Sequence, residues 1–337
     1  MAEQKTHKYN NPVTATLTGI RDLFRKQVPS GTLKPGDRLD GKTVLVDGAS
    51  SGLGLATALD VARRGATLVM ACRSGIPEKG EWIRRKSESN RVHMLHVDFA
   101  DSRSIREMVS SLKAALDSGA IPGGRIDILV CNAGIVPKKS RRTPQGLEEM
   151  FMVNYFSKFL FVNMLLQEGC FGSHASGSIP RMVIVGSESH RNPEAFDWDG
   201  FGVYRNYSIG KSIELYGYYK LLLTTFAVEL SRRLNAAGNG RISVFPMCPG
   251  PVNSNIAREA PRLFQPLLKT VFGIFFKSPA KAAIPVVYLA ASPDQEGKVF
   301  DYFFLMTRKE VDDKAMDPAN GRRLWDLSEK LASTLEK

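Results

Sequence analysis

The sequence predicts an α/β fold in which helices cover both faces of a doubly wound parallel sheet. Short, continuously apolar runs alternate along the chain with amphipathic helical segments, as strands buried on both faces require. The first apolar run is followed at once by a glycine-rich turn, a helix and a second apolar run, which together form a βαβ unit. Further repeats of this alternation predict one extended sheet.

Each predicted strand is an apolar run that ends in a polar or glycine-containing segment. The runs occupy residues 42–47, 66–73, 91–100, 125–134, 181–187 and 241–250. Helices are predicted after the glycine-rich turn and over residues 101–119, 146–168 and 214–234, with a polar insertion at 188–213. We expect a single domain at 41–337 that includes an apolar substrate lid at about 251–278, and an extension at 1–40. Within the extension, Val13, Leu17, Ile20 and Phe24 share one helical face.

Composition excludes several classes of protein. The chain has 337 residues, and its 46 Lys and Arg against 34 Asp and Glu give a net charge of +12. The basic residues are scattered along the chain and show no nucleic-acid-binding signature. Its four cysteines have neither zinc-site nor disulfide-framework spacing, so no metal is expected. Without a signal-like or membrane-spanning apolar run, we expect a cytoplasmic protein, or one peripheral on the cytoplasmic face of a membrane, and not a secreted one.

The glycine-rich turn predicts a dinucleotide site. Gly48, Gly52 and Gly54 lie between a strand and a helix, where backbone approaches a pyrophosphate and the helix N-terminus binds it. Arg73 follows the second strand, at the place where NAD-specific folds carry an acidic residue, and it can pair with a 2′-phosphate. NADP(H) is therefore favoured over NAD(H). Asp98 suits an adenine amino group, although it is also an ordinary turn former.

A candidate proton-transfer pair lies on the helix at 214–234. Tyr216 and Lys220 are four residues apart on one face, and a nearby ammonium favours the phenolate. Tyr207 and Lys211 repeat the spacing, so spacing alone does not choose between the pairs. Glycines at 210 and 217 make the earlier copy a poor helix.

The motifs, taken in order, resemble those of the short-chain dehydrogenase/reductase family from about Lys42 to Val311. DGASSGLG is similar to T-G-x-x-x-G-x-G, CNAG to N-N-A-G, and CPGPVNS to the family's P-G stretch. MACR, IVGSESH, the insertion and the E-L-x-R-R-L helix ending look most like the retinol dehydrogenase branch, whose relatives include WW-domain oxidoreductases and light-dependent protochlorophyllide reductases. Asp47 departs from the pattern by standing where the family usually has Thr, an extra carboxylate that would weaken phosphate binding unless it points away.

The resemblance implies a Rossmann-type fold and assigns the site residues. In the branch, E-L-x-R-R-L begins thirteen residues after the catalytic tyrosine, which selects Tyr216 over Tyr207. The implied catalytic residues are Asn154, Ser187, Tyr216 and Lys220. The implied cofactor-binding residues are Gly48, Ser50, Ser51, Gly52, Leu53, Gly54, Arg73, Asp98, Phe99, Asn132, Ala133, Gly134, Tyr216, Lys220, Val252 and Ser254.

The expected activity is NADP(H)-dependent hydride transfer between nicotinamide and a carbonyl or alcohol of a bulky apolar substrate, such as a retinoid, a steroid or a fatty aldehyde. Reduction of a carbon–carbon double bond of protochlorophyllide type and a non-catalytic NADPH-binding sensor or scaffold are the alternatives. The insertion's Arg191 and its aromatic residues are expected at the pocket entrance. Peripheral membrane contact, through the N-terminal helix or the lid, and a homo-oligomer are left open.

Overall fold

The computed structural model of the protein describes residues 28–172, 178–236, 242–252 and 277–335. The predicted N-terminal helix, residues 253–276 of the predicted lid, and Ser254 lie outside the described residues. The two described ends of the lid region are adjacent, because Val252 pairs with Lys277 in an isolated parallel bridge.

The described part of the chain forms a sheet of eight strands in the order β3-β2-β1-β4-β5-β6-β7-β8. All neighbouring strands are parallel except β8, which is antiparallel to β7. The strands are β1 Thr43–Asp47, β2 Thr67–Cys72, β3 Val92–His96, β4 Ile128–Cys131, β5 Arg181–Val185, β6 Ser243–Cys248, β7 Tyr302–Phe304 and β8 Thr307–Lys309. The strand order reverses between β1 and β4, which is where open α/β sheets bind ligands at their carboxyl ends.

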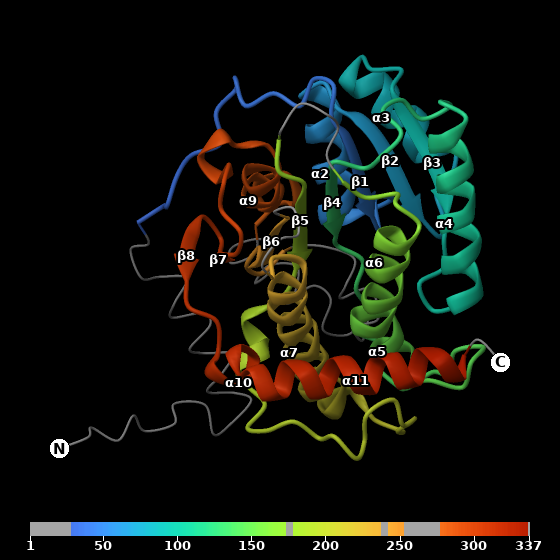
Figure 1. Cartoon of the computed structure of the whole chain (residues 1–337), viewed down its shortest axis with the longest axis vertical. Coiled ribbons are helices and arrows are strands. Elements are labelled where there is room, and N and C mark those ends of the chain that lie inside the picture. Colours follow the sequence, from blue (N-terminus) through green and yellow to red (C-terminus); the bar gives the residue numbers. More distant parts are fainter. Residues whose placement is uncertain (1–27, 173–177, 237–241, 253–276, 336–337) are drawn as a thin grey trace, which may run out of the picture.

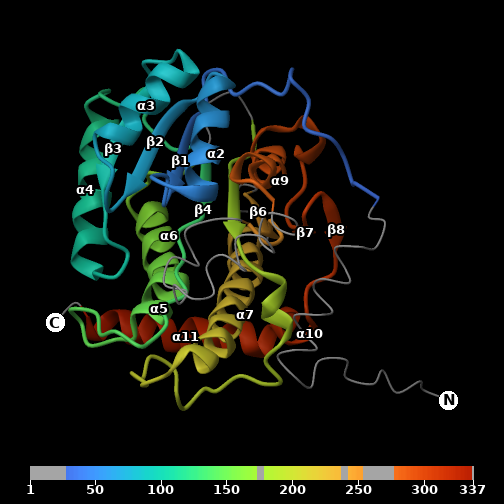
Figure 2. The same cartoon turned by 180° about the vertical axis from the view of Figure 1, so that it is seen from behind.

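Helices cover both faces of the sheet (Figures 1 and 2). The helices are α2 Gly52–Arg63, α3 Glu78–Ser87, α4 Ser102–Asp117, α5 Glu149–Phe151, α6 Ser157–Gln167, α7 Ile209–Leu234, α9 Pro279–Ala291, α10 Asp313–Met316 and α11 Pro318–Thr334. Side chains alternate along each strand, so that Leu45 packs with α4, α6 and α7, whereas Val44 and Val46 pack with α2 and α9. The predicted doubly wound, Rossmann-type architecture is confirmed.

Two predicted helices differ from the observed ones. The single helix expected at 146–168 is divided into α5, a π-helical turn at Met152–Phe156 and α6. The helix expected from Glu214 begins at Ile209 and includes Gly210 and Lys211, so the glycine does not break it, but Tyr207 lies before its first residue and the earlier pair does not share a helical face. Buried Ser212 and Leu215 anchor this segment, and tertiary packing outweighs the low helix propensity of glycine.

The C-terminal helix α11 lies across one end of α7 (Figure 1). Its Trp325 ring packs edge-on against Phe159 at a centroid distance of 5.2 Å and is stacked with Phe226 at 5.9 Å. Ser328 and the fully buried Tyr155 share a hydrogen bond of 2.5 Å between their hydroxyl oxygens. The helix therefore holds both α6 and α7 in place.

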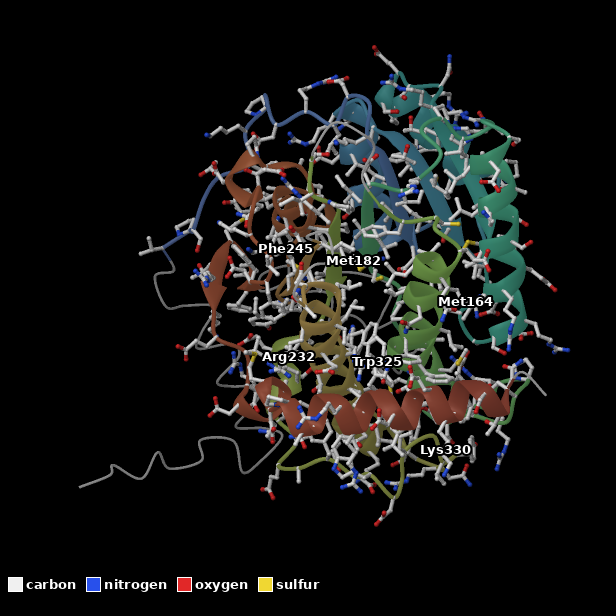
Figure 3. All side chains as sticks on the ribbon, in the orientation of Figure 1. Met164, Met182, Arg232, Phe245, Trp325 and Lys330 are labelled. Atoms are coloured by element: carbon white, nitrogen blue, oxygen red, sulfur yellow. The ribbon has the colours of Figure 1, made fainter. Side chains whose placement is uncertain are left out.

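We expect Trp325→Ala to lower the free energy of unfolding by about 3–5 kcal/mol, because it leaves a cavity among aromatic rings. Lys330→Ala is the matched control, since Lys330 lies on the same helix but points away from the core (Figure 3). It should change stability by no more than about 0.5 kcal/mol. Urea unfolding measures both values, and equal losses would contradict the docking role of Trp325.

Candidate functional site

The glycine-rich turn leaves β1 and brings backbone close to the start of α2. Gly48 and Gly52 have positive φ angles of 61° and 53°, which favour glycine. A Cβ added at Gly54 would lie 2.3 Å from the Gly48 carbonyl oxygen, so this position also requires glycine. Ser51 precedes α2 without a side-chain capping bond, and Ser50 lies beside Cys72. The turn and the helix N-terminus form a cradle that fits a pyrophosphate.

The loop after β4 forms the next part of this cradle. The Asn132 side chain donates a hydrogen bond of 3.1 Å to the Asp47 carbonyl oxygen, which ties the loop to the glycine-rich turn. A Cβ added at Gly134 would lie 3.3 Å from Asn154 Oδ1 and 3.8 Å from Lys220 Nζ. Gly134, a predicted cofactor residue, thus lies beside Asn154 and Lys220, two of the predicted catalytic residues. Val252 follows β6 at the same edge of the sheet.

Arg73 and Asp98 extend from the ends of β2 and β3. The Arg73 side chain is 62% exposed, and its Nη1 lies 3.6 Å from Asp98 Oδ2. Asp98 also accepts the Ala100 N–H through Oδ1 at 2.9 Å, as a turn former does. The Phe99 side chain is buried in the core, which leaves its backbone to line the cradle.

Ser187 and Tyr216 meet at the carboxyl end of β5. Burial, helped by the Cys248 thiol, raises the pKa of the Tyr216 phenol, and a hydrogen bond with Ser187 acts in the opposite direction. Ser187 Oγ also accepts a hydrogen bond from the Ser189 N–H at 3.2 Å, at the start of a 3₁₀ turn over Glu188–Arg191. A hydroxyl and a phenol are thereby placed beside each other.

Lys220 and Asn154 lie behind this pair. Lys220 Nζ is 5.7 Å from the centre of the Tyr216 ring and donates a hydrogen bond of 2.8 Å to the Val185 carbonyl oxygen. Burial is the largest cause that lowers the pKa of Lys220, to about 8. The Asn154 side chain, in the π-helical turn, exchanges two hydrogen bonds with the Ile135 backbone, at 2.8 and 2.9 Å. The turn thus aims Asn154 at the site.

The other tyrosine–lysine pair is occupied elsewhere. The Tyr207 hydroxyl donates a hydrogen bond of 2.7 Å to Glu148 Oε1, and its side chain is 8% exposed. Lys211 forms an ion pair with Glu214 at 2.5 Å on the surface of α7. Neither side chain is directed at Ser187, so the geometry favours Tyr216 and Lys220.

The predicted pocket-entrance residues of the insertion mostly pack into the fold. Phe201 lies edge-on to Phe151 at 5.3 Å, Tyr207 is held by Glu148, and Phe196 stacks on Trp198 at 4.4 Å. For Tyr207 the expectation of an entrance role was wrong, because its side chain is buried in the aromatic core, whereas Phe201 packs against that core and remains partly exposed.

A charged cluster beneath Ser187 was not predicted. Glu188 accepts hydrogen bonds from the Tyr302 hydroxyl at 2.6 Å and from Lys309 Nζ at 2.8 Å. The buried His190 ring lies 2.7 Å, through Nδ1, from the Ser187 carbonyl oxygen, and burial lowers its pKa to about 4. The two partners of Glu188, Tyr302 and Lys309, come from β7 and β8, which are strands of only three residues each that the sequence pattern did not reveal.

The structure also resolves the placing of Asp47. Its carboxylate is fully buried, accepts hydrogen bonds from the Asn132 and Ala133 N–H groups, and lies 3.0 Å from Lys158 Nζ of α6. Sequence reasoning missed Lys158, although an isolated lysine in the apolar stretch FMVNYFSKFLFV, four residues after Asn154, is a usable signal.

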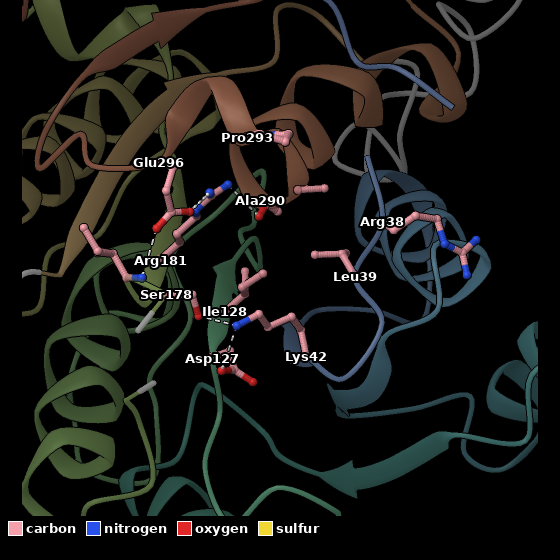
Figure 4. Close-up of a pocket in the computed structure, with 12 residues that line it drawn as sticks. Arg38, Leu39, Lys42, Asp127, Ile128, Ser178, Arg181, Ala290, Pro293 and Glu296 are labelled. Atoms are coloured by element: carbon pink, nitrogen blue, oxygen red, sulfur yellow. Dashed lines mark hydrogen bonds and ion pairs between the residues drawn. The ribbon is translucent and has the colours of Figure 1, made fainter. Parts of the chain in front are cut away.

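A separate hollow of about 190 Å³ lies at the amino end of the sheet, away from these residues (Figure 4). Its charged groups have partners: Lys42 lies 3.8 Å from Asp127, and Arg181 lies 2.6 Å from Glu296. Across the described ranges, no group of three or more His, Cys, Asp or Glu side chains is arranged to hold a metal ion. Within the same ranges, no helix is long and apolar enough to span a bilayer.

Curated proteins of similar sequence match nearly the whole chain. Retinol dehydrogenase 14 from Mus musculus is 33% identical over 93% of this chain and 92% of its own length. Retinol dehydrogenase 13 from Homo sapiens is 31% identical over 96% and 95%. The WW domain-containing oxidoreductase from Danio rerio is 32% identical over 88% and 69%.

Solved structures and a family model agree with these relatives. A protein of unassigned function from Mycobacterium paratuberculosis has a TM-score of 0.64 and 28% identity, covering 88% of this chain and 95% of its own. The angucycline C-6 ketoreductase LanV, solved with bound NADP, shares the fold with a TM-score of 0.59 and 23% identity over 80% and 95%. The short chain dehydrogenase model matches residues 42–197. The chain therefore belongs to the short-chain dehydrogenase/reductase family, in its retinol dehydrogenase branch.

Proposed function

We propose that the chain is an NADP(H)-dependent oxidoreductase that interconverts a carbonyl and an alcohol on a bulky apolar substrate. The observation that carries the proposal is the meeting of Ser187, Tyr216, Lys220 and Asn154 beside a glycine-rich cradle at the carboxyl edge of the sheet. When bound, the nicotinamide cofactor supplies or accepts the hydride at the substrate carbon.

Tyr216 transfers the proton at the substrate oxygen, and Ser187 donates a hydrogen bond to that oxygen. In the cofactor-free protein, burial keeps the Tyr216 phenol protonated by raising its pKa. Protonated Lys220, 5.7 Å from the ring centre, favours the phenolate as the proton leaves. Asn154 and Lys220 both flank Gly134, which supports a shared role in moving the proton onward.

The preference for NADP(H) is proposed from Arg73. Its side chain is 62% exposed, and its guanidinium can form a charge-assisted pair with a 2′-phosphate at the end of β2. Asp98, 3.6 Å from Arg73, partly offsets this positive charge and is also placed to accept a hydrogen bond from a ribose or an adenine. We propose that the balance favours the 2′-phosphate.

An apolar substrate is proposed from the relatives, two of which are named for retinol. Activity over a panel of retinoid, steroid and fatty aldehydes would identify the substrate class. We also propose that residues 41–337 form one domain, and that the protein works in the cytoplasm or peripherally on the cytoplasmic face of a membrane. The continuous packing from β1 to α11 supports the single domain.

We expect Tyr216→Phe to lower kcat by about 10²–10⁴-fold, because the phenol proton is lost while the ring remains. The dissociation constant of NADP⁺ should stay within about threefold of the wild-type value, since the hydroxyl adds at most a single neutral hydrogen bond. Steady-state kinetics and fluorescence titration measure the two quantities.

Tyr207→Phe is the matched control, because it removes the hydroxyl of the second Y-x-x-x-K copy. It should retain turnover and lose about 1.5–3 kcal/mol of stability, because it breaks the hydrogen bond to the Glu148 carboxylate. Retained turnover in Tyr216→Phe, or its loss in Tyr207→Phe alone, would reverse the assignment.

Arg73→Met should weaken NADP⁺ binding by about tenfold to a hundredfold and leave NAD⁺ binding nearly unchanged, since only NADP⁺ carries the 2′-phosphate. Arg85→Met, an exposed arginine on α3, is the control for loss of surface charge. Titration of each variant with both cofactors gives the ratio, and an unaltered ratio in Arg73→Met would exclude 2′-phosphate recognition by this residue.

A further inference from the structure

An ion pair is buried beneath the cofactor cradle. Asp47 Oδ2 lies 3.0 Å from Lys158 Nζ, and the side chains are 0% and 2% exposed. Apart from this contact, neither atom has a hydrogen-bond partner within the described residues. Each charge thus depends on the other, because an uncompensated charge in the interior is strongly unfavourable.

Asp47 joins the two backbone segments that form the cradle. Its Oδ1 accepts the Asn132 N–H at 2.6 Å and also the Ala133 N–H. The Asn132 side chain returns a hydrogen bond to the Asp47 carbonyl oxygen. The carboxylate therefore fixes the end of β1, where the glycine-rich turn begins, against the loop after β4.

Lys158 reaches this carboxylate from the opposite side. It lies four residues after Asn154, so the π-helical turn and the start of α6 together place both side chains near the site. Its ammonium is 3.9 Å from the centre of the Phe99 ring, next to Asp98 at the predicted adenine end. An ammonium held between a carboxylate and an aromatic face has a fixed position.

The pair also influences Lys220. After burial, Lys158 is the next cause that lowers the pKa of Lys220, while the Cys248 thiol and Asp47 act to raise it. Cys131, the buried thiol at the end of β4, lies close enough for Asp47 to raise its pKa and Lys158 to lower it. The facing groups are thus Asp47 from β1, Cys131 from β4, Lys158 from α6 and Cys248 from β6.

We propose that Lys158 is a positioning residue whose ammonium neutralises the Asp47 carboxylate, so that the cradle can accept an anionic pyrophosphate above a buried acidic group. The inference rests on the proposed function, since it requires a dinucleotide in the cradle. It explains how this chain carries Asp47 where the family usually has an uncharged Thr. According to this inference, cofactor binding depends on the net charge of the Asp47–Lys158 pair, and not only on the structural contact between the two side chains.

The test uses Lys158→Met, Asp47→Asn and the double variant, which change the net charge of the pair from zero to −1, +1 and zero. At an effective dielectric constant of about 20, a unit charge within about 10 Å of another changes a binding constant on the order of tenfold or more. Lys158→Met should bind NADP⁺ at least about tenfold more weakly than the wild type does. The double variant should bind NADP⁺ with the wild-type affinity, and Asp47→Asn should bind it no more weakly than the wild type.

Isothermal titration at pH 7 on the full chain measures these constants, after thermal unfolding has shown which variants are folded. If Lys158→Met does not fold, Asp47→Asn and the double variant can still be compared, since they differ only at Lys158. Asp47→Asn should then bind NADP⁺ about tenfold more tightly than the double variant does. Lys158→Arg keeps the charge and should bind NADP⁺ within about threefold of wild type.

The pH profile of kcat/KM supplies a second readout. Removal of the Lys158 cation should raise the pKa assigned to Lys220, whereas removal of the Asp47 carboxylate should lower it further below about 8. A pair that acts only as a structural brace predicts equal weakening of NADP⁺ binding in both single variants and no opposite pKa shifts, and that result would overturn the inference. Wild-type protein that binds neither NADP⁺ nor NAD⁺ would instead overturn the proposed function, and the inference with it.

Discussion

Burial of the sheet on both of its faces is the constraint on which the rest of the structure depends. The central strands are buried, so their backbone polar groups form hydrogen bonds with neighbouring strands. The side chains on both faces of the sheet also require helices to cover them. Parallel strands also bring all their carboxyl ends to one edge. The glycine-rich turn, the loop after β4, Ser187 and Val252 meet there because of topology, although they are far apart along the chain.

The same burial shapes the chemistry of that edge. In the low-dielectric interior, charges act over longer distances than in water, and each ionised group has to be offset by a neighbour. Glu188 is offset by Lys309 and Asp47 by Lys158, whereas Lys220 donates a hydrogen bond to the neutral Val185 carbonyl oxygen and its pKa is influenced by both Lys158 and Asp47. Burial is the largest cause that lowers the pKa of Lys220, to about 8.

Local patterns were sufficient to predict most of the fold. The six apolar runs correspond to β1–β6, and the glycines that need positive φ or close approach were visible as a motif. Strands β7 and β8 escaped notice because three residues carry no periodic signal, and α7 began earlier than its glycine suggested because Ser212 and Leu215 are buried. Propensity acts within a few residues, whereas these outcomes depend on packing.

The site was predictable to a similar extent. Order along the chain selected Tyr216, and the structure adds the reason that Tyr207 is unsuitable, its bond to Glu148. The Asp47–Lys158 pair could not be derived from spacing, since its members come from β1 and α6 and meet only in three dimensions.

The docking of α11 has a consequence for the order in which the protein acquires its site. A ribosome releases the strands and α7 before α11, yet Trp325 packs on Phe226 of α7, and Arg232 of α7 bonds the backbone just before α11. A domain generally folds as a unit, which requires the segments that pack together to be available. The helix that carries Tyr216 and Lys220 therefore completes its packing only after α11 has joined it, so the site residues receive this support from a segment that is translated later than they are.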